Sequence, residues 1–386
     1  MITTPVRWVI GTSLTMAAAM GIGRFVYTPM LPLMSETYSW TFSQAGDVAS
    51  ANFLGYLVGA LLAPKIAHAS HVRLLVALSL MASVATTYLG AEVNRYEAWL
   101  LVRFASGVAS AFCLVVLTTH LLETLAREKA EHLGNIHFAG VGLGIMICVG
   151  GYYLGGSVEE QWARQGGIAA AFMAIAWFAL SPGPWLASKK THEAGALSSE
   201  EKASLWRLIF GYGFFGFGYV VSATFIVSMA DTVSGLSDPA LVWIVVGAAT
   251  IPSVYAWQWL ANRFGLMSAL AYSYVTLSVG VFLAGWSSTL TMIVIAAALL
   301  GGTFGGVTAL GLSAGRAVAQ NHTAYAVSTM TVAFSLGQLL GPAVAGRMAD
   351  TLGSFLWPSV LCSVLLILSV LLLPKTSLSK QMTDEP

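Results

Sequence analysis

One arginine, Arg24, lies inside a long apolar stretch near the start of the chain, within the sequence GIGRFVYTPMLPLM (Gly21 to Met34). A guanidinium in hydrocarbon costs about 2.5–3.5 kcal/mol, and Pro29 and Pro32 in the same stretch deprive a helix of backbone hydrogen bonds. A membrane helix retains such residues most readily when it lines a water-filled cavity and moves. We therefore expect Arg24 to bind a carboxylate or similar oxyanion through its planar guanidinium. The alternative is an arginine that extends to the lipid headgroups.

Further polar side chains occur at spacings that place them near Arg24 in a helical membrane protein. Tyr27 follows Arg24 by three residues and shares its helical face. Asn52 and Tyr56, four residues apart in the next apolar run, either flank the same cavity or form hydrogen bonds between helices. His137 lies well inside an apolar run, where it either faces the substrate and relays a proton or bonds to a neighbouring helix.

Asp47 and Arg103 lie at similar depths, about one and a half turns inside the ends of two predicted helices. Equal depth permits an ion pair, which costs far less in a membrane than a lone charge. Such a pair is either static or a proton site, in which protonation of Asp47 releases Arg103 or Arg24 and changes the packing. Because we find no acidic residue deeper in the apolar runs, the cavity around Arg24 should be electropositive and favour an anionic substrate.

The composition predicts how these residues are held. The chain has 386 residues, of which 57% are hydrophobic and 9% are charged, whereas soluble domains contain about 25% charged residues. This composition indicates an all-α integral membrane protein. The net charge of +1 and the lack of a basic patch give no indication of nucleic-acid binding. The three cysteines show no metal-ligand spacing, so we expect no metal and no cofactor.

Twelve apolar runs are long enough to cross a bilayer, for which a helix needs about 20 residues. They span residues 8–34, 42–63, 72–91, 97–119, 132–155, 166–187, 205–231, 239–261, 267–286, 289–312, 324–347 and 355–374. The longest polar connection predicts a cytoplasmic linker at 188–204 between two six-helix bundles, 1–187 and 205–374, and residues 375–386 form a predicted tail. Thirteen of the 18 Lys and Arg residues fall on the side of the N-terminus and three, Arg95, Arg164 and Arg347, on the other. This bias predicts a multi-pass protein with both termini in the cytoplasm, and we expect a monomer in a bacterial inner membrane.

The two halves repeat. A shift of 195 residues places GIGRFVY (Gly21–Tyr27) on GFGYVVS (Gly216–Ser222), so that Tyr219 corresponds to Arg24. A parallel repeat of six helices is typical of one class of transporters that bind substrate at the interface between the repeats. The second half offers aromatic and neutral polar side chains, which either close over the uncharged part of a substrate or pack against neighbouring helices. They are Phe215, Tyr219, Ser222, Tyr255, Phe304, Phe334 and Gln338.

The whole chain resembles the major facilitator superfamily (MFS). Gly21 to Met34 resembles the signature of its YbfB/YjiJ-type branch. RFASGVASAF (Arg103–Phe112) is similar to the arginine-and-glycine motif of the fourth helix, and GQLLGPAVAG (Gly337–Gly346) resembles the GxxxGP pattern of the eleventh. The resemblance implies twelve helices in two pseudo-symmetric bundles and transport by alternating access. It implies no particular substrate.

The residues and the resemblance together predict a secondary active transporter of a small, carboxylate-like organic anion. No nucleotide-binding motif is present, so an ion gradient should drive transport, and Asp47 and His137 favour proton coupling. The expected partners are the substrate, protons and the lipid bilayer. The alternative is a proton-coupled exporter of amphipathic or drug-like compounds, which would use the aromatic side chains as an adaptable pocket. We expect no enzymatic activity, because no nucleophile or metal constellation occurs within the apolar runs.

Overall fold

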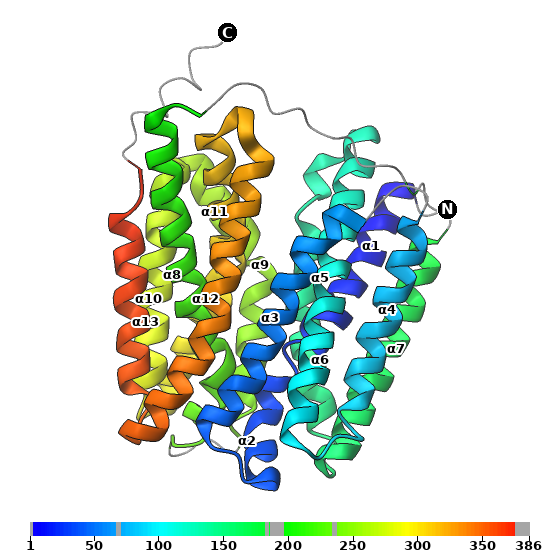
Figure 1. Ribbon diagram of the computed structural model, residues 1–386, viewed down its shortest axis with the longest axis vertical. Helices are drawn as coiled ribbons and strands as arrows, with labels where there is room; N and C mark the ends of the chain where they lie inside the picture. The colour runs from blue at the N-terminus through cyan, green and yellow to red at the C-terminus, as the bar shows by residue number, and fades with distance from the viewer. Residues whose placement is uncertain (1–2, 67–70, 182–184, 186–196, 234–237, 375–386) are drawn as a thin grey trace.

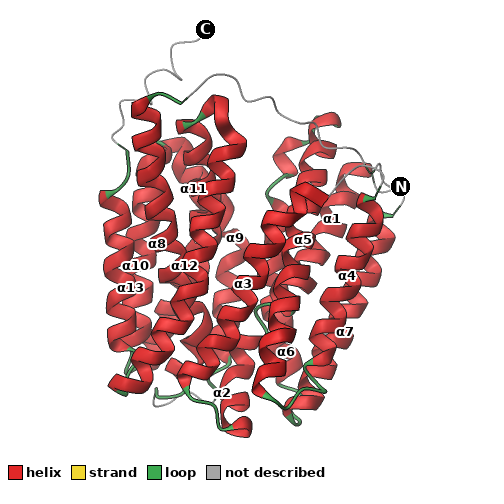
Figure 2. Ribbon diagram, in the orientation of Figure 1, coloured by secondary structure: helices red, strands yellow, loops and turns green. Residues whose placement is uncertain are grey.

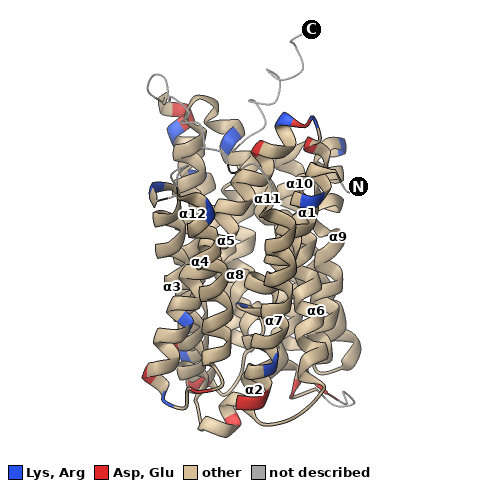
Figure 3. Ribbon diagram, turned by 90° about the vertical axis from the view of Figure 1, so that its right-hand side faces the viewer, with Lys and Arg blue, Asp and Glu red and all other residues tan. Residues whose placement is uncertain are grey.

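The computed structural model describes residues 3–66, 71–181, 185, 197–233 and 238–374, and helices dominate these ranges (Figures 1 and 2). Within these described ranges, eleven helical spans are long and apolar enough to cross a membrane, and the apolar helix Leu356–Leu371 is shorter. Most charged residues lie toward the two ends of the helices, and few lie between them (Figure 3). The predicted all-helical membrane fold is confirmed.

The helices form two groups of six spans. The first group contains α1 (Thr4–Met16), the π-helix η1 (Ala17–Ile22), α2 (Tyr27–Tyr38), α3 (Phe42–Ile66), α4 (Val72–Leu89), α5 (Tyr96–Arg127), α6 (Ala139–Tyr152) and α7 (Val158–Leu180). The second contains α8 (Ser199–Ala230), α9 (Leu241–Phe264), α10 (Leu266–Trp286), α11 (Leu290–Val318), α12 (Thr323–Leu352) and α13 (Leu356–Leu371). Short 3-10 helices η2 (Glu131–Leu133) and η3 (Ile136–Phe138) precede α6, and η4 (Gln320–His322) precedes α12. The groups lie side by side and meet along α2 and α8, α3 and α12, and α6 and α9 (Figure 1).

The start of the second group differs from its predicted boundary. Helix α8 begins at Ser199, inside the predicted linker, because Ser198 and Glu201 form a capping box that satisfies the first backbone donors. The Ser198 amide donates to Glu201 Oε2 at 2.8 Å, and the Glu201 amide donates to Ser198 Oγ at 3.2 Å. Residues 188–196 of the predicted linker and the predicted tail, 375–386, lie outside the described residues.

The first span is broken rather than continuous. The amides of Gly23 and Phe25 donate to carbonyls five residues earlier, on Ala18 and Met20, at 2.8 and 3.1 Å, which is the bonding of a π-helix. The chain then turns over residues 23–26 before α2 begins. Pro29 explains the turn, because it has no N–H for the Phe25 carbonyl and its ring crowds that group. The predicted run 8–34 is therefore two helices separated at Arg24.

The pseudo-symmetry of the halves has a direct structural counterpart. Thr28 Oγ1 on α2 donates to the Ala223 carbonyl on α8 at 2.6 Å, and these two residues are 195 positions apart. Residues that the sequence repeat relates thus meet at the interface between the halves. We call the end where α1 begins and α13 ends the terminal end, and the other the opposite end (Figure 1).

Candidate functional site

Arg24 lies in the break of the first span and points into the interface between the halves. Its side chain is 4% exposed, and Nη2 donates to Gln338 Oε1 at 3.1 Å. The guanidinium carbon lies 4.5 Å from the ring centroid of Phe53 and 4.4 Å from that of Tyr56. The rings hold the planar cation through cation–π attraction. Arg24 is therefore an interior group and does not extend to the headgroups.

Gln338 on α12 connects Arg24 to Tyr219 on α8. Its Nε2 donates to the Tyr219 hydroxyl, while its Oε1 accepts from Arg24. Arg24 and Tyr219, which correspond in the repeat, therefore bond to the same side-chain amide, Arg24 to its oxygen and Tyr219 to its nitrogen. Because the Tyr219 oxygen accepts this bond, its own proton is available for a further acceptor.

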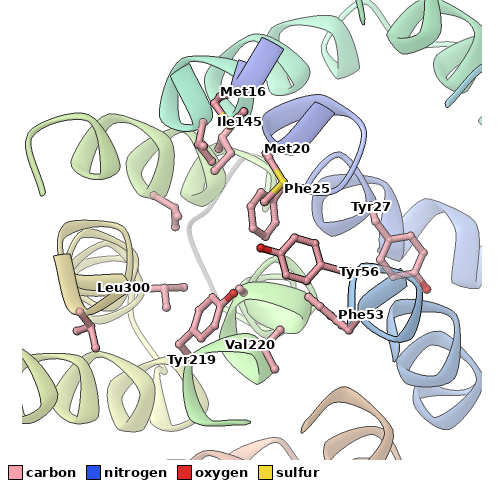
Figure 4. Close-up of a cluster of buried hydrophobic side chains, with 14 of the residues drawn as sticks. Met16, Met20, Phe25, Tyr27, Phe53, Tyr56, Ile145, Tyr219, Val220 and Leu300 are labelled. Atoms are coloured by element: carbon pink, nitrogen blue, oxygen red, sulfur yellow. The ribbon is translucent and has the colours of Figure 1, made fainter. Parts of the chain in front are cut away.

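Aromatic rings form the wall beside this amide. The ring of Tyr219 is parallel to those of Phe304 and Phe334, with interplanar angles of 6° and 3° and centroid distances of 5.7 Å. Phe25, Tyr56 and Tyr219 converge on one space from three elements, and Tyr27 points away from it (Figure 4).

A cavity of about 400 Å³ occupies this space, within the size range of small-molecule sites. Seven of the predicted site residues line it: Arg24, Tyr56, His137, Tyr219, Phe304, Phe334 and Gln338. The lining continues along α11 to Arg316, which is exposed near the terminal end. Among the residues that the structure describes, this lining contains two arginines and no aspartate or glutamate.

His137 lines the cavity from η3, at the start of the fifth span. Its Nδ1 lies 2.6 Å from the Gly134 carbonyl oxygen, and its Nε2 lies 3.2 Å from Thr118 Oγ1. Because a carbonyl oxygen only accepts, Nδ1 carries the proton, and Nε2 of the neutral ring accepts from the Thr118 hydroxyl. His137 is thus both bonded to neighbouring residues and open to the cavity.

Five of the predicted substrate-binding residues do not line the cavity. Tyr27 donates from its hydroxyl to the Ala45 carbonyl at 2.8 Å. Asn52 donates to the Arg103 carbonyl at 3.0 Å and joins α3 to α5, which is the interhelical alternative. Tyr255 is 43% exposed. It therefore lies on an exposed part of α9 and is not one of the side chains that line the cavity.

The other two are buried behind the cavity. Phe215 is stacked on Tyr219 at a centroid distance of 5.1 Å and an angle of 26°, so it supports the wall from within α8. Ser222 is fully buried about one turn beyond Tyr219 on the same helix. Both positions contribute to packing between α8 and its neighbours.

The predicted ion pair between Asp47 and Arg103 does not occur. Arg103 instead donates from Nη1 to the Gly23 carbonyl at 3.0 Å and from Nη2 to the Arg24 carbonyl at 2.9 Å. Ser106 Oγ also donates to the Gly23 carbonyl, at 3.2 Å. These carbonyls lack regular helical partners because the span is broken there, and a buried carbonyl requires a donor. Arg103 therefore stabilises the turn that carries Arg24.

Asp47 pairs with the other half of the molecule. Its carboxylate accepts from Arg347 on α12, with N–O distances of 2.8 and 3.1 Å. One helical turn away, Asp350 accepts from the Phe42 and Ser43 amides, at 2.9 and 2.8 Å, and from the Ser43 hydroxyl. A carboxylate of the second half thus caps the N-terminus of α3. These contacts join the two halves at the opposite end.

Other residues of the site did not come from the sequence analysis. Phe53 lies three residues before Tyr56, and this spacing could have indicated that both rings contact the same cation. Phe25 adjoins Arg24 in the chain. Arg316 was counted among the cytoplasmic loop charges, but it belongs to the cavity lining, because α11 extends to Val318.

Comparisons with known proteins agree with this architecture. The model of a family described as "Uncharacterised MFS-type transporter YbfB" matches residues 16–374. No curated protein matches the chain in sequence. The crystal structure of the nucleoside transporter NupG aligns with a TM-score of 0.69 at 14% identity, covering 100% of both chains. The crystal structure of a mutant form of NupG aligns with a TM-score of 0.71 at 14% identity, covering 96% of this chain and 98% of that one. At this identity the structural likeness concerns the fold alone.

Proposed function

Because this chain belongs to the family of YbfB-type MFS transporters, we propose that its substrate is a small organic anion with a carboxylate-like group. The protein is thus a multi-pass membrane transporter, and the proposal concerns what it carries. The observation that supports it is the cavity lining, which contains Arg24 and Arg316 and, among the described residues, no acidic side chain. Positive charge on the walls of a cleft, with one arginine buried, attracts anions and disfavours cations.

Arg24 is the group that binds the anion. Its guanidinium is fixed by rings on either side, and its Nε has no hydrogen-bond partner among the described residues. A buried donor without a partner is costly, and a substrate carboxylate supplies the acceptor. A carboxylate can accept two parallel bonds from a guanidinium, so Arg24 fixes the orientation of the substrate as well as its charge.

Alternating access follows from the contacts between the halves. The cavity lining extends toward the terminal end, and the Asp47–Arg347 pair and the Asp350 cap close the opposite end. We expect the terminal end to face the cytoplasm, so this conformation is inward-facing. Transport requires these contacts to break while the halves close around the substrate at the terminal end.

Protons are the proposed coupling ion, and His137 is the proposed coupling residue. It is the lining side chain whose ordinary pKa lies nearest neutral pH. Asp47 and Arg103 take other roles, one in closing the opposite end and one in holding the turn. An imposed pH gradient should drive substrate accumulation in proteoliposomes. His137→Gln should retain substrate exchange and lose gradient-driven accumulation, whereas accumulation that persists in this variant would reject the coupling role.

Two other substrate classes compete with this proposal. The apolar part of the lining, with Phe25, Phe304 and Phe334, also suits amphipathic or drug-like compounds, which an exporter would carry. The structural neighbour NupG is a nucleoside transporter, so neutral nucleosides form a third class. The three classes differ in how much they depend on the positive charge of Arg24.

A thermal-shift screen on the purified protein separates these classes. Carboxylates, sulfonates, nucleosides and lipophilic cations are compared on wild type and on Arg24→Gln. A carboxylate should stabilise wild type and bind the variant about tenfold to a hundredfold more weakly, since hydrogen bonds to charged groups contribute about 1.5–3 kcal/mol.

Arg95→Gln is the matched control, because Arg95 is exposed far from the cavity. It should bind carboxylates as wild type does. Suppose that carboxylates stabilise neither wild type nor either variant, and that nucleosides or lipophilic cations stabilise both wild type and Arg24→Gln. The substrate is then not an anion. Flux of the best ligand in proteoliposomes then distinguishes a substrate from an inhibitor.

A further inference from the structure

The aromatic side chains beside Arg24 form a stack rather than a loose lining. Tyr219, Phe304 and Phe334 have nearly parallel ring planes. Behind them, Phe215 and Tyr212 lie against Phe334 at centroid distances of 5.3 and 5.1 Å and angles of 28° and 27°. The rings come from three helices, and these pairs lie within 28° of parallel, whereas Tyr212 and Phe215 are tilted by 41° to each other.

The stack ends at the cavity. Tyr212 and Phe215 are fully buried, whereas Phe304 and Phe334 are half-buried and line the cavity. Rings that only filled the core would be covered on both faces by neighbouring helices. Here Phe304 and Phe334 belong to the stack and also line the space that Arg24 faces, so a flat ligand can pack against them and extend the stack.

Two hydrogen bonds connect the Arg24 guanidinium to the aromatic stack. Arg24 donates to Gln338, and Gln338 donates to the hydroxyl of Tyr219, whose ring belongs to the stack. A ligand that engages both must therefore carry its anionic group close to a planar ring. A long flexible chain between ring and carboxylate would not fit this separation.

We propose that the transported anion is an aromatic carboxylate. Its carboxylate takes the place of Gln338 Oε1 on Arg24, and its ring adds to the stack at Phe304 and Phe334. The Tyr219 hydroxyl, with its proton unused in the bond from Gln338, donates to the second carboxylate oxygen. This inference rests on the proposed function and narrows its substrate class.

Binding of three probes to the purified full-length protein tests the inference. Benzoate has a planar ring and a negative charge, cyclohexanecarboxylate has the same charge on a puckered ring, and benzamide has the planar ring without the charge. We expect benzoate to bind on the order of threefold to tenfold more tightly than cyclohexanecarboxylate, the effect of one favourable aromatic pair. Benzamide should bind more weakly than both acids.

Two variants test whether Phe304 and Phe334 cause the preference for a planar ring. Phe304→Leu and Phe334→Leu keep apolar volume and remove a ring, so each should reduce the ratio between benzoate and cyclohexanecarboxylate affinities toward one. Phe210→Leu is the matched control, because Phe210 is exposed on the outer surface of α8, and it should leave the ratio unchanged.

The outcomes separate this inference from the proposed function. Equal affinities of wild type for the two acids would overturn the aromatic preference and leave the anion carrier intact. Binding of benzamide as tightly as benzoate would overturn the carboxylate assignment here. If neither acid binds while another anion does, the aromatic class is wrong. If no anion binds at all, the proposed function fails as well. The comparison of probes on wild type requires no variant to fold.

Discussion

Arg24 and Gln338 are joined by a 3.1 Å hydrogen bond across the interface between the two halves of the molecule. The amide oxygen of Gln338 is therefore located where an oxygen of an anionic substrate would bind. Substrate and Gln338 compete for the same guanidinium, and a bound anion releases the amide that connects the halves through Arg24 and Tyr219. This competition makes Gln338 the most informative position for substitution.

Gln338→Glu should weaken binding of the anion at least tenfold. The new carboxylate is nearly the same size as the amide and forms an ion pair with Arg24, so a substrate anion must displace a charge rather than a neutral oxygen. Charge-assisted bonds are roughly twice as strong as neutral ones. Titration of the purified protein with the best anion from the ligand screen measures the change.

Gln258→Glu is the control for Gln338→Glu, because Gln258 also lines the cavity and bonds to Asn262 rather than to Arg24. It adds the same negative charge without occupying the guanidinium and should weaken binding much less. Equal losses in both variants would mean that the effect is general charge repulsion and that Gln338 does not compete with substrate.

The Asp47–Arg347 pair should hold the opposite end closed. Exposed pairs contribute at most about 1 kcal/mol, and the Arg347 side chain is 57% exposed. Asp47→Asn should therefore raise the population open at the opposite end by up to about fivefold. Distances between spin labels on Thr37→Cys of α2 and Thr351→Cys of α12 measure this population. The charge swap Asp47→Arg with Arg347→Asp should restore it, and a swap that behaves like the single variant would count against the pair.

Asp350 should contribute more to this closure than the Asp47–Arg347 pair. It accepts from two backbone amides at the N-terminus of α3, and the loss of such a cap costs about 0.5–2 kcal/mol. These bonds join the two halves, so opening of the opposite end breaks both of them. Asp350→Ala should therefore open the labelled end more than Asp47→Asn does. A smaller effect from Asp350→Ala would show that the cap adds little to the closure.

The repeat in the sequence predicted the relation between the two halves, but not how each charge is paired. The 195-residue repeat makes Tyr219 the counterpart of Arg24, and in the structure both side chains form hydrogen bonds to Gln338. The positions of Asp47 and Arg103 along their helices predicted that both residues lie at the same depth in the membrane. It does not define the direction in which each side chain points around its helix. Asp47 faces the other half, and Arg103 faces the broken first span.

Aromatic positions were harder to predict because hydrophobic periodicity is weak in a membrane. Lipid and protein core are both apolar, so a helix such as α9 shows little contrast between its faces. Phe304 and Phe334 line the cavity, and Tyr255 is exposed and does not line it, although all three occur in similar apolar sequence. A cavity residue whose counterpart in the repeat is charged, as Arg24 is the counterpart of Tyr219, could be predicted from the sequence. The positions of cavity residues without such a counterpart depend on how the helices pack in the folded protein.

Arg103 should control the affinity for the anion without touching it. Its two terminal nitrogens donate to the Gly23 and Arg24 carbonyls, and the guanidinium fork spans both acceptors at once. The ammonium of Arg103→Lys keeps the charge and has no such fork, so the turn that carries Arg24 loses at least one donor. A buried unsatisfied carbonyl costs about 1–3 kcal/mol. Arg103→Lys should therefore lower the melting temperature and weaken anion binding about tenfold, whereas Arg24→Gln should weaken binding more. Arg103→Lys with wild-type affinity and a lowered melting temperature would mean that Arg103 supports the fold alone and does not position Arg24.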